Sequence, residues 1–429
     1  MNEYSTPPYI LYAVPAFLAL IGIELLVTRI IKKDYYRLND SINDLTLGTY
    51  SRVIGAFYAG AFFLLYVWLY ENARMFDLTA GGLYTLAAIP VWIGGFLAVD
   101  MLYYWFHRTS HQVAVVWGSH EPHHSSEEYN LAVALRQGSF QGIFSYWFYL
   151  PLAFIGLHPV IFLTCSQFNT IYQFWIHTRA IDKMWAPIEW IFNTPSHHRV
   201  HHGINPKYID KNHAGTLIIW DKLFGTFQAE EEEAVYGTVK PLASWNPVWA
   251  NVQYWIGLAK KTAKTPGALN KLKVWFAKPG WQPAEMGGMR PIPEVDPATF
   301  VKYDPRIPGG SGAYVFFHFV LTIPIFVVYA LLVGANVFSV AGIGGGLFIL
   351  FTLFNIGMIM EGRSYMFGLE LFRNLLMGVG GLWLGYINGM ALTLGLPLLV
   401  LGLGSAIWFT RYWKNASDAG DVAAAPMAA

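Results

Sequence analysis

The sequence is poor in charge and almost free of cysteine. Of its 429 residues only 13% are Asp, Glu, Lys or Arg, against roughly 25% in an average soluble domain. The formal net charge is +1, which gives no indication of a nucleic-acid partner. The single cysteine, Cys165, excludes an intramolecular disulfide framework and a cysteine-rich metal site. It lies in an apolar stretch, so we expect it to be a small core residue.

Long uncharged runs take the place of the missing charge. A helix that spans a bilayer needs about 20 mainly apolar residues, and five runs approach or exceed this length: 9–27, with Glu24 as its only charge, 53–70, 81–99, 313–334 and 337–360. Two further runs are long enough for helical hairpins: 140–176, with a turn at 156–159, and 374–410, with a break at 386–389. We therefore expect an all-α integral membrane protein built as a helical membrane bundle.

Lys and Arg predict the orientation of this bundle. Arg29, Lys32, Lys33 and Arg37 follow the first apolar run, and residues 177–310 contain sixteen Lys and Arg. By the positive-inside rule both regions are cytoplasmic. The N-terminus lacks a basic segment, so run 9–27 is interpreted as a retained helix. We expect a multi-pass protein of a bacterial inner membrane, or of the endoplasmic reticulum in a eukaryote.

The composition divides the chain into five parts. They are N-terminal membrane helices (1–106), a histidine-rich catalytic region around the hairpin 140–176 (107–230), a polar, Pro/Gly-rich cytoplasmic connector (231–311), C-terminal membrane helices (312–410) and a tail (411–429). The Ala-rich end of the tail, after Asp421, is expected to be disordered.

Twelve of the thirteen histidines fall between residues 107 and 213. They form three short motifs: HRTSH (107–111), HEPHH (120–124) and HHRVHH (197–202). Imidazole is a common ligand for iron, zinc and copper, and one metal seldom takes more than six ligands. Three motifs that supply at least eight imidazoles therefore predict a two-metal site at the cytoplasmic membrane face. The lack of cysteine argues against a zinc finger or an iron–sulfur cluster.

The remaining histidines are assigned one by one. His177 ends the uncharged run 140–176, and from there it can reach the same site from a different element. It is expected to be a ligand, with Gln173 one turn earlier as its partner. For His197 the pattern leaves metal ligand, hydrogen-bond donor and helix cap open. The others, His158, His213 and His318, are expected to be structural.

Metal-bound imidazoles usually donate their second N–H to a carboxylate or a carbonyl. Carboxylates near enough in sequence are Asp100, Glu121, Glu127, Glu128 and Asp221. Asp100 is the strongest candidate, because it lies two turns before His107 in an otherwise uncharged helix, where an ionisable residue is costly and usually functional. Asp100 and Glu128 are the candidate catalytic residues. A solvated charge suits Glu127 and the Glu run 230–233 better.

Together these motifs resemble the fatty acid hydroxylase/sterol desaturase superfamily of membrane di-iron enzymes. The resemblance is strongest over residues 85–230. Within the superfamily the chain is similar above all to the alkylglycerol monooxygenase branch, whose members use a pterin and cleave ether lipids. It rests on YYWFHRTSH (103–111), HEPHHSSEEYNLAVALRQ (120–137), QFNTIYQFWIHT (167–178), NTPSHHRVHHGIN (193–205) and DKNHAGTLIIWDKLFGTF (210–227).

The resemblance implies a ligand set and a cofactor. Two Fe ions would be held by the eight box histidines, with His177 joining them: His107, His111, His120, His123, His124, His198, His201 and His202. The branch has an acidic residue where this chain has Gln112, so its tetrahydropterin contact does not carry over by position. The family more often has an aromatic residue at the position of His213, so His213 is not carried over as a ligand.

The expected function is an O2-dependent di-iron monooxygenase of membrane lipids. On an alkylglycerol it would hydroxylate the carbon next to the ether oxygen and so release an aldehyde. An alternative is a sterol, fatty acyl or carotenoid hydroxylase or desaturase, which would depend on a redox partner protein. A di-zinc lipid hydrolase would favour carboxylate ligands that the motifs lack. A metal carrier or a bis-histidine haem protein is also open, although haem needs histidine pairs in facing spans.

Overall fold

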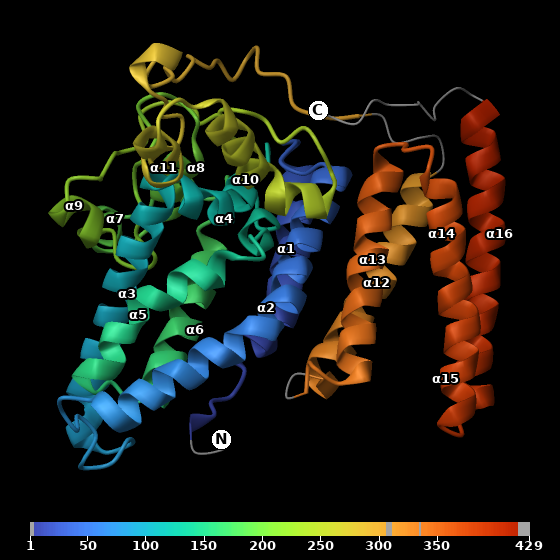
Figure 1. The fold of residues 1–429 in the computed structure, drawn as a ribbon, viewed down its shortest axis with the longest axis horizontal. Coiled ribbons are helices and arrows are strands. Elements are labelled where there is room, and N and C mark those ends of the chain that lie inside the picture. The colour runs from blue at the N-terminus through green and yellow to red at the C-terminus, as the bar shows by residue number, and fades with distance from the viewer. Residues whose placement is uncertain (1–3, 306–310, 334–335, 419–429) are drawn as a thin grey trace. The chain divides into compact units, whose positions relative to one another are not determined.

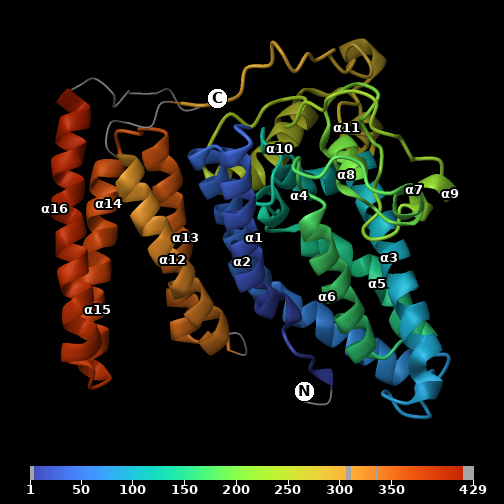
Figure 2. The ribbon, with the colours of Figure 1, turned by 180° about the vertical axis from the view of Figure 1, so that it is seen from behind.

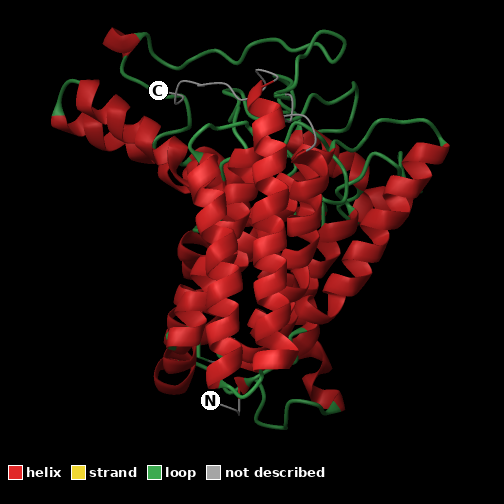
Figure 3. Cartoon of the chain, turned by 90° about the vertical axis from the view of Figure 1, so that its right-hand side faces the viewer, coloured by secondary structure: helices red, strands yellow, loops and turns green. Residues whose placement is uncertain are grey.

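The computed structural model describes residues 4–305, 311–333 and 336–418, and within them all regular structure is helical. The one strand-like feature there is an isolated bridge between Gly203 and Tyr236, and Figure 3 accordingly shows helices joined by loops. Among these described residues, six helices are long and apolar enough to cross a membrane: Tyr9–Ile30, Leu38–Ala73, Leu86–Gln112, Ser311–Leu331, Val340–Met360 and Ala391–Lys414. The expected all-α, multi-pass membrane protein is confirmed.

The chain forms two compact units. The first consists of Met1–Leu242 and Ala250–Lys302, and the second of Ala243–Trp249 and Tyr303–Ala429. All histidines except His318 belong to the first unit. Residues 419–429 lie outside the described residues. The disorder expected after Asp421 concerns these residues.

In the first unit the membrane helices are α1 (Tyr9–Ile30), α2 (Leu38–Ala73) and α3 (Ile89–Gln112), which a short 3-10 turn, η2 (Leu86–Ala88), precedes. α2 begins fifteen residues before the uncharged run 53–70. Its first turns are polar yet buried, because the side chains of Asn43 and Asp44 accept hydrogen bonds from the buried guanidinium of Arg136. The uncharged run alone therefore underestimates the length of this helix.

The predicted hairpin is present as α5 (Gln141–Ile155) and α6 (Pro159–Trp175). Its turn contains Gly156 at φ +104°, where a Cβ atom would lie 2.0 Å from the carbonyl oxygen of Phe76. At 1.5 Å per residue the two helices are about 23 and 26 Å long, shorter than the roughly 30 Å hydrocarbon core. α6 packs on α1 and α3, and its C-terminal end leads directly to His177.

Short helices gather at one end of α3, α5 and α6 (Figures 1 and 2). They are α4 (Ala114–His124), η3 (Val133–Leu135), α7 (Ala186–Ile191), α8 (Pro195–His202), α9 (Ile219–Leu223), α10 (Pro247–Lys264), α11 (Ala268–Phe276) and η4 (Ala284–Met286). α10 packs closely on α4. A Cβ atom added to Gly118 of α4 would lie only 2.4 Å from the indole ring of Trp255 on α10. The main apolar core lies deeper, around Tyr66, Val99 and Ile161, and contains Cys165 as a free buried thiol. The prediction for Cys165 is thus confirmed.

The second unit contains α12 (Ser311–Val333), α13 (Val340–Met360), α14 (Met366–Leu375), α15 (Gly381–Ile387) and α16 (Leu396–Asp418). Two π-helical turns, η5 (Leu376–Gly380) and η6 (Ala391–Gly395), interrupt the run 374–410. The predicted break is confirmed at Gly389, which has φ +70°. The helices pack closely here, since a Cβ on Gly402 of α16 would lie 2.5 Å from the Asn374 carbonyl oxygen.

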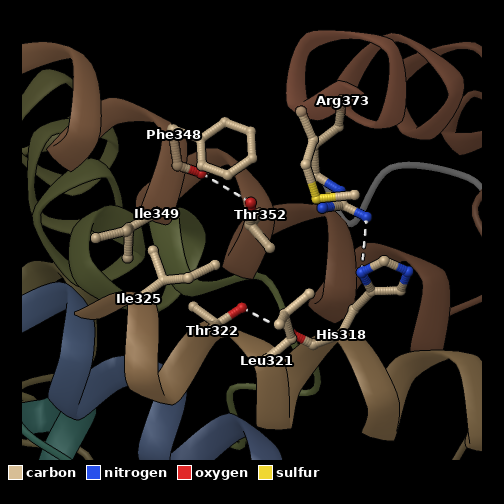
Figure 4. A pocket seen from close by; sticks show the side chains of 9 residues that line it. His318, Leu321, Thr322, Ile325, Phe348, Ile349, Thr352 and Arg373 are labelled. Carbon is tan, nitrogen blue, oxygen red and sulfur yellow. Dashed lines mark hydrogen bonds between the residues drawn. The ribbon is translucent and has the colours of Figure 1, made fainter. Parts of the chain in front are cut away.

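A buried ion pair forms the polar centre of the second unit. Glu370 and Arg373 are 1% and 2% exposed and lie 2.5 Å apart. Arg373 also donates to Nδ1 of His318 at 3.2 Å, which confirms a structural role for this histidine. Figure 4 shows the small pocket beside these residues, lined by His318, Thr322, Thr352 and Arg373 among apolar side chains.

Breaking this ion pair is expected to destabilise the second unit. Arg373→Met leaves the Glu370 carboxylate buried without its cation, which should cost about 3–5 kcal/mol of unfolding free energy. The measurement is unfolding in mixed detergent–SDS micelles. The double variant Arg373→Met/Glu370→Gln should recover part of the loss. Lys207→Met, at an exposed ion pair, is the control and should change little. A single Arg373 variant as stable as the unsubstituted protein would contradict the assignment.

Candidate metal centre

Nine buried histidines meet at the end of the first unit where the short helices gather. Their ring nitrogens form two groups, in each of which the ligand atoms all lie within 4.8 Å of one another. The five-histidine group contains His107, His111, His120, His124 and His201, and the four-histidine group contains His123, His177, His198 and His202. These are the nine histidines that the sequence analysis selected, so the structure brings all of them together.

Helical periodicity explains how each motif divides between the two groups. Residues i and i+4 share a helix face, so His107 and His111 on α3, and His120 and His124 on α4, point into the five-histidine group. His123 lies on a neighbouring face of α4 and enters the other group. On α8 the division is reversed.

In α8 the i, i+4 pair His198 and His202 belongs to the four-histidine group, and His201 to the five-histidine group. α8 begins at Pro195, with Thr194 as the N-cap of a capping box. Each of α4 and α8 therefore supplies ligands to both groups, which ties the two groups to the same pair of helices.

Within each group the Nε2 atoms face one another at short distances. In the five-histidine group the separations are 2.8 Å for His107–His120 and 3.2 Å for both His120–His124 and His124–His201. In the other group they are 3.0 Å for His177–His198 and 3.5 Å for His123–His177. Nitrogens that bind one metal at about 2.0–2.1 Å lie about 2.8–3.4 Å apart, so these separations fit a shared ion.

Oxygen acceptors lie behind five of these rings and determine which nitrogen carries the proton. Nδ1 lies 2.6–2.9 Å from a backbone carbonyl or amide oxygen in each case, and the pairs are His107–His213 O, His120–Gln141 Oε1, His123–Arg136 O, His177–Gln173 O and His201–Lys211 O. Because such oxygens only accept, Nδ1 must donate, and the Nε2 lone pair then points into the group. This is the arrangement that metal-bound histidines adopt.

These features fit a pair of bound metal ions. Several unprotonated Nε2 atoms that face one another at about 3 Å repel unless a cation lies between them. Nε2 of His111 and of His202 are buried and have no hydrogen-bond partner among the described residues. All-imidazole donor sets suit iron, zinc or copper. The nine histidines therefore form two sites that can each hold one metal ion.

Burial keeps these imidazoles neutral. It lowers the pKa of His123 to about 4 and that of His201 to about 3, and burial together with neighbouring imidazoles lowers the pKa of His198 and His202 as well. Neutral imidazole is the form that binds metal. An unfolded histidine takes up its proton near pH 6.5, so this site loses folding stability as the pH falls below that value.

Arg136 connects the centre to α2. Its buried guanidinium donates to Pro122 O and Ser125 Oγ beside the second motif, and to Asn43 and Asp44 on α2. Its own carbonyl accepts from His123. The sequence analysis did not select Arg136, nor Gln141, because neither their spacing nor their type marks them as partners of a histidine.

Three carboxylates hold the loops around the centre. Glu24 of α1 accepts hydrogen bonds from Tyr36, from the backbone of Leu131 and from Thr178, the residue after His177. Asp221 accepts from the backbone nitrogens of His213 and Ala214, each at 2.8 Å. Burial raises the pKa of Asp221 to about 6, although these donors oppose the shift.

Asp100, the third, has a different role from the one expected. Its carboxylate accepts from the backbone nitrogens of Thr216 and Leu217, and from the side chains of Asn169 and Trp220. These donors take up both oxygens, and none belongs to a histidine. Asp100 therefore secures the segment after His213 to α3 and α6.

Glu128 likewise has partners other than histidine in its described ion pairs. Its buried carboxylate forms ion pairs with Arg37 at 2.8 Å, Arg179 at 2.9 Å and Lys302 at 2.6 Å. Glu121, another candidate, accepts from Gln253 of α10, and burial raises its pKa to about 7. For five of the metal-site histidines the acceptor is thus a carbonyl or amide oxygen. The carboxylate of Asp210, which the sequence did not mark, lies 3.9 Å from Nδ1 of a sixth, His111.

The open roles of the other histidines are now distinguishable. His197 points away from both groups, with Nε2 3.0 Å from Glu189, and it completes the capping box of α8. Partial burial raises the pKa of Glu189, but its hydrogen bonds, above all that from His197, lower it by more. The resulting pKa is about 2. His158 caps the start of α6. Gln173 is the partner of His177, as expected. The atom that accepts from Nδ1 of His177 is the backbone carbonyl oxygen of Gln173 and not its side chain.

Comparisons with known proteins agree with this geometry. The fatty acid hydroxylase family matches residues 92–226, which include all nine histidines. Alkylglycerol monooxygenase of Xenopus tropicalis is 39% identical over 379 residues, covering 87% of this chain and 82% of the relative. The Danio rerio enzyme of the same name is 36% identical over 96% of this chain and 91% of the relative.

A more distant relative has another substrate in its name. The ornithine lipid hydroxylase OlsE of Rhizobium tropici is 28% identical over 137 residues, 31% of this chain and 40% of the relative. No solved structure matches this chain.

Removing one imidazole should empty one site. His201→Ala takes a ligand from the five-histidine group and should lower metal content from two ions per chain toward one. His197→Ala, four residues earlier on the same helix, is the matched control and should retain both ions. The measurement is metal content by mass spectrometry after anaerobic purification. Equal metal content in both variants would contradict the grouping.

Asp100 should affect stability more than metal content. Asp100→Asn cannot accept all four hydrogen bonds, and the buried donors left unpaired should cost about 2–4 kcal/mol. We expect a lower free energy of unfolding with the metal-to-protein ratio unchanged. Asp182→Asn, at a carboxylate that is 98% exposed, serves as control. A loss of metal from folded Asp100→Asn protein would instead restore the role expected from the sequence.

Proposed function

This chain belongs to the alkylglycerol monooxygenase family and is a membrane-bound lipid monooxygenase, and we propose that it holds two iron ions and cleaves the ether bond of alkylglycerols. The reaction inserts one oxygen atom of O2 into the C–H bond next to the ether oxygen. The other oxygen atom leaves as water, for which a reductant supplies two electrons and two protons are taken up. The hemiacetal so formed collapses to an aldehyde and a glycerol.

The observation that carries this proposal is the pair of all-imidazole groups. Its proposed ligands are the nine histidines of the two groups, and iron bound there would supply O2 activation. The chain's own part is to hold the imidazoles neutral and aimed inward, through the oxygens behind Nδ1. Burial of every one of these residues also excludes bulk water from the reacting groups.

The all-nitrogen donor set favours an oxygenase over a di-zinc hydrolase. Catalytic zinc sites of hydrolases commonly include a carboxylate ligand. Other partners take up the oxygens of the buried carboxylates Asp100, Asp221 and Glu128. Glu121, within the second motif, accepts from Gln253 through Oε1, and its Oε2 has no partner among the described residues. Neither group of histidines includes an Asp or Glu.

A second candidate keeps the chemistry and changes the lipid. The likeness to an ornithine lipid hydroxylase supports hydroxylation of another membrane lipid as the alternative. Both substrates are amphiphiles with a polar head and a long alkyl chain. A site at the end of a bundle of membrane helices suits either one, since the head can remain at the interface while the chain stays in an apolar environment.

The electron donor and the membrane are part of the proposal. Tetrahydropterin is the proposed reductant, as in the branch that the chain resembles, although Gln112 replaces the acidic residue at the expected contact. A protein redox partner is the alternative. We place the protein in a bacterial inner membrane with the metal centre on the cytoplasmic face. The support is that α10 and α11, which carry five lysines, lie at the same end of α3, α5 and α6 as the histidine helices α4 and α8 (Figure 1).

The test combines metal content with product analysis. Protein purified anaerobically should contain about two irons per chain. With O2 and tetrahydropterin it should convert a 1-O-alkylglycerol to the fatty aldehyde, and His123→Ala should abolish turnover. A matched acyl lipid and a ferredoxin system test the alternatives in parallel. Two tightly held zincs that iron does not replace, with no O2-dependent product, would refute the oxygenase.

A further inference from the structure

His213 is the one histidine beside the metal centre whose ring has no assigned task. Its backbone is fully engaged, since its nitrogen donates to Asp221 at 2.8 Å and its carbonyl oxygen accepts from Nδ1 of His107 at 2.7 Å. The structural role expected from the sequence is therefore fulfilled by the backbone alone. That role does not require an imidazole side chain.

The ring itself is completely buried and unpaired. His213 is 0% exposed, and neither Nδ1 nor Nε2 has a hydrogen-bond partner among the described residues. A neutral imidazole has one donor and one acceptor nitrogen, and leaving both unsatisfied in a buried place is costly. A bulky apolar side chain could fill the same space without this cost. The ring therefore indicates a partner that protein atoms do not provide.

The neighbours of the ring identify that partner. Its centroid lies 5.1 Å from that of His111, 5.7 Å from that of His201 and 5.8 Å from that of His107. All three belong to the five-histidine group. The centroids of these three rings lie 4.4–5.3 Å from one another, so the ring of His213 lies at the edge of the group, just outside the set of nitrogens that are all within 4.8 Å of one another.

The ring also lies beside an oxygen that can orient it. The backbone carbonyl of Asp210 lies near enough to the imidazole to oppose the lowering of its pKa by burial, although it forms no hydrogen bond with either ring nitrogen among the described contacts. The loop 210–213 thus faces this side of the centre with a row of carbonyl oxygens, those of residues 210, 211 and 213. In the metal-bound protein a His213 ring that donated to the Asp210 carbonyl would leave its other nitrogen free to bind the ion, as in the five oriented histidines.

We propose that His213 is a tenth metal-site histidine, which supplies a sixth imidazole to the ion held by His107, His111, His120, His124 and His201. The inference rests on the proposed metal centre and makes its two sites unequal, with six imidazoles at one ion and four at the other. An ion with six imidazoles has no position left for another ligand. Exchange of external ligands would then fall to the four-histidine group.

The test uses Co²⁺ in place of iron, because its visible absorption becomes more intense as the coordination number falls. His123→Ala provides a background in which only the five-histidine group keeps its complete set. In that background we compare His213 with His213→Phe, which keeps the shape of the ring and removes both nitrogens. His158→Phe applies the same change to a histidine outside both groups and is the matched control.

The expected result is a clear increase in band intensity for His213→Phe and none for the control. Release of Co²⁺ to a chelator should also become roughly tenfold faster or more. An unchanged spectrum and an unchanged release rate would overturn the proposal and leave His213 as a packing group. Absence of bound metal from the unsubstituted protein would instead refute the proposed centre itself.

A second measurement does not depend on the variants folding. In an experimental structure of the metal-loaded, unsubstituted protein, a His213 nitrogen should lie about 2.0–2.3 Å from the ion of the five-histidine group, as imidazole ligands do. A nitrogen more than about 3 Å from that ion, with protein or water as its partner, would contradict the proposal.

Discussion

The structure depends on one electrostatic constraint: nine neutral imidazoles are buried with their lone pairs facing one another. Nε2 atoms only 2.8–3.5 Å apart repel in the absence of a cation. Carbonyl and amide oxygens behind the rings prevent them from turning away, because each holds an Nδ1 proton in a hydrogen bond. Folding thus prepares two sites whose unfavourable arrangement bound metal would relieve, and the surrounding elements serve to keep that arrangement intact.

Charged residues stabilise this part of the protein as anchors of the scaffold. Glu24 ties the loops before Leu131 and after His177 to the first membrane helix. Asp100 and Asp221 hold the segment 213–220 by its backbone nitrogens, and Arg136 joins the second histidine motif to α2. A buried carboxylate is tolerated where several donors satisfy it. The cost of an ionisable group in a membrane helix therefore indicates structural importance as well as catalytic importance.

The same reasoning separates the two polar centres of the chain. Glu370 and Arg373 of the second unit satisfy each other through direct hydrogen bonds, and Arg373 donates to Nδ1 of His318, so a single imidazole nitrogen there, Nε2 of His318, has no partner among the described residues. The histidines of the first unit present several nitrogens without protein partners. Several unpaired nitrogens gathered in one place, rather than burial or polarity alone, mark the region that requires a ligand.

The sequence alone determined the fold class, most of the membrane helices, the hairpin and the nine histidines, because apolar run length and i, i+4 spacing are local properties. It could not show that the polar start of α2 is buried, since Arg136, which satisfies it, is over ninety residues away. Only the tertiary structure decided that α4 and α8 divide their histidines in opposite ways between the two groups. It also decided that Asp100 and Glu128 lie among scaffold contacts and that the ring of His213 lies beside the centre. Each of these depends on how distant segments are rotated and packed against one another, which spacing along the chain does not encode.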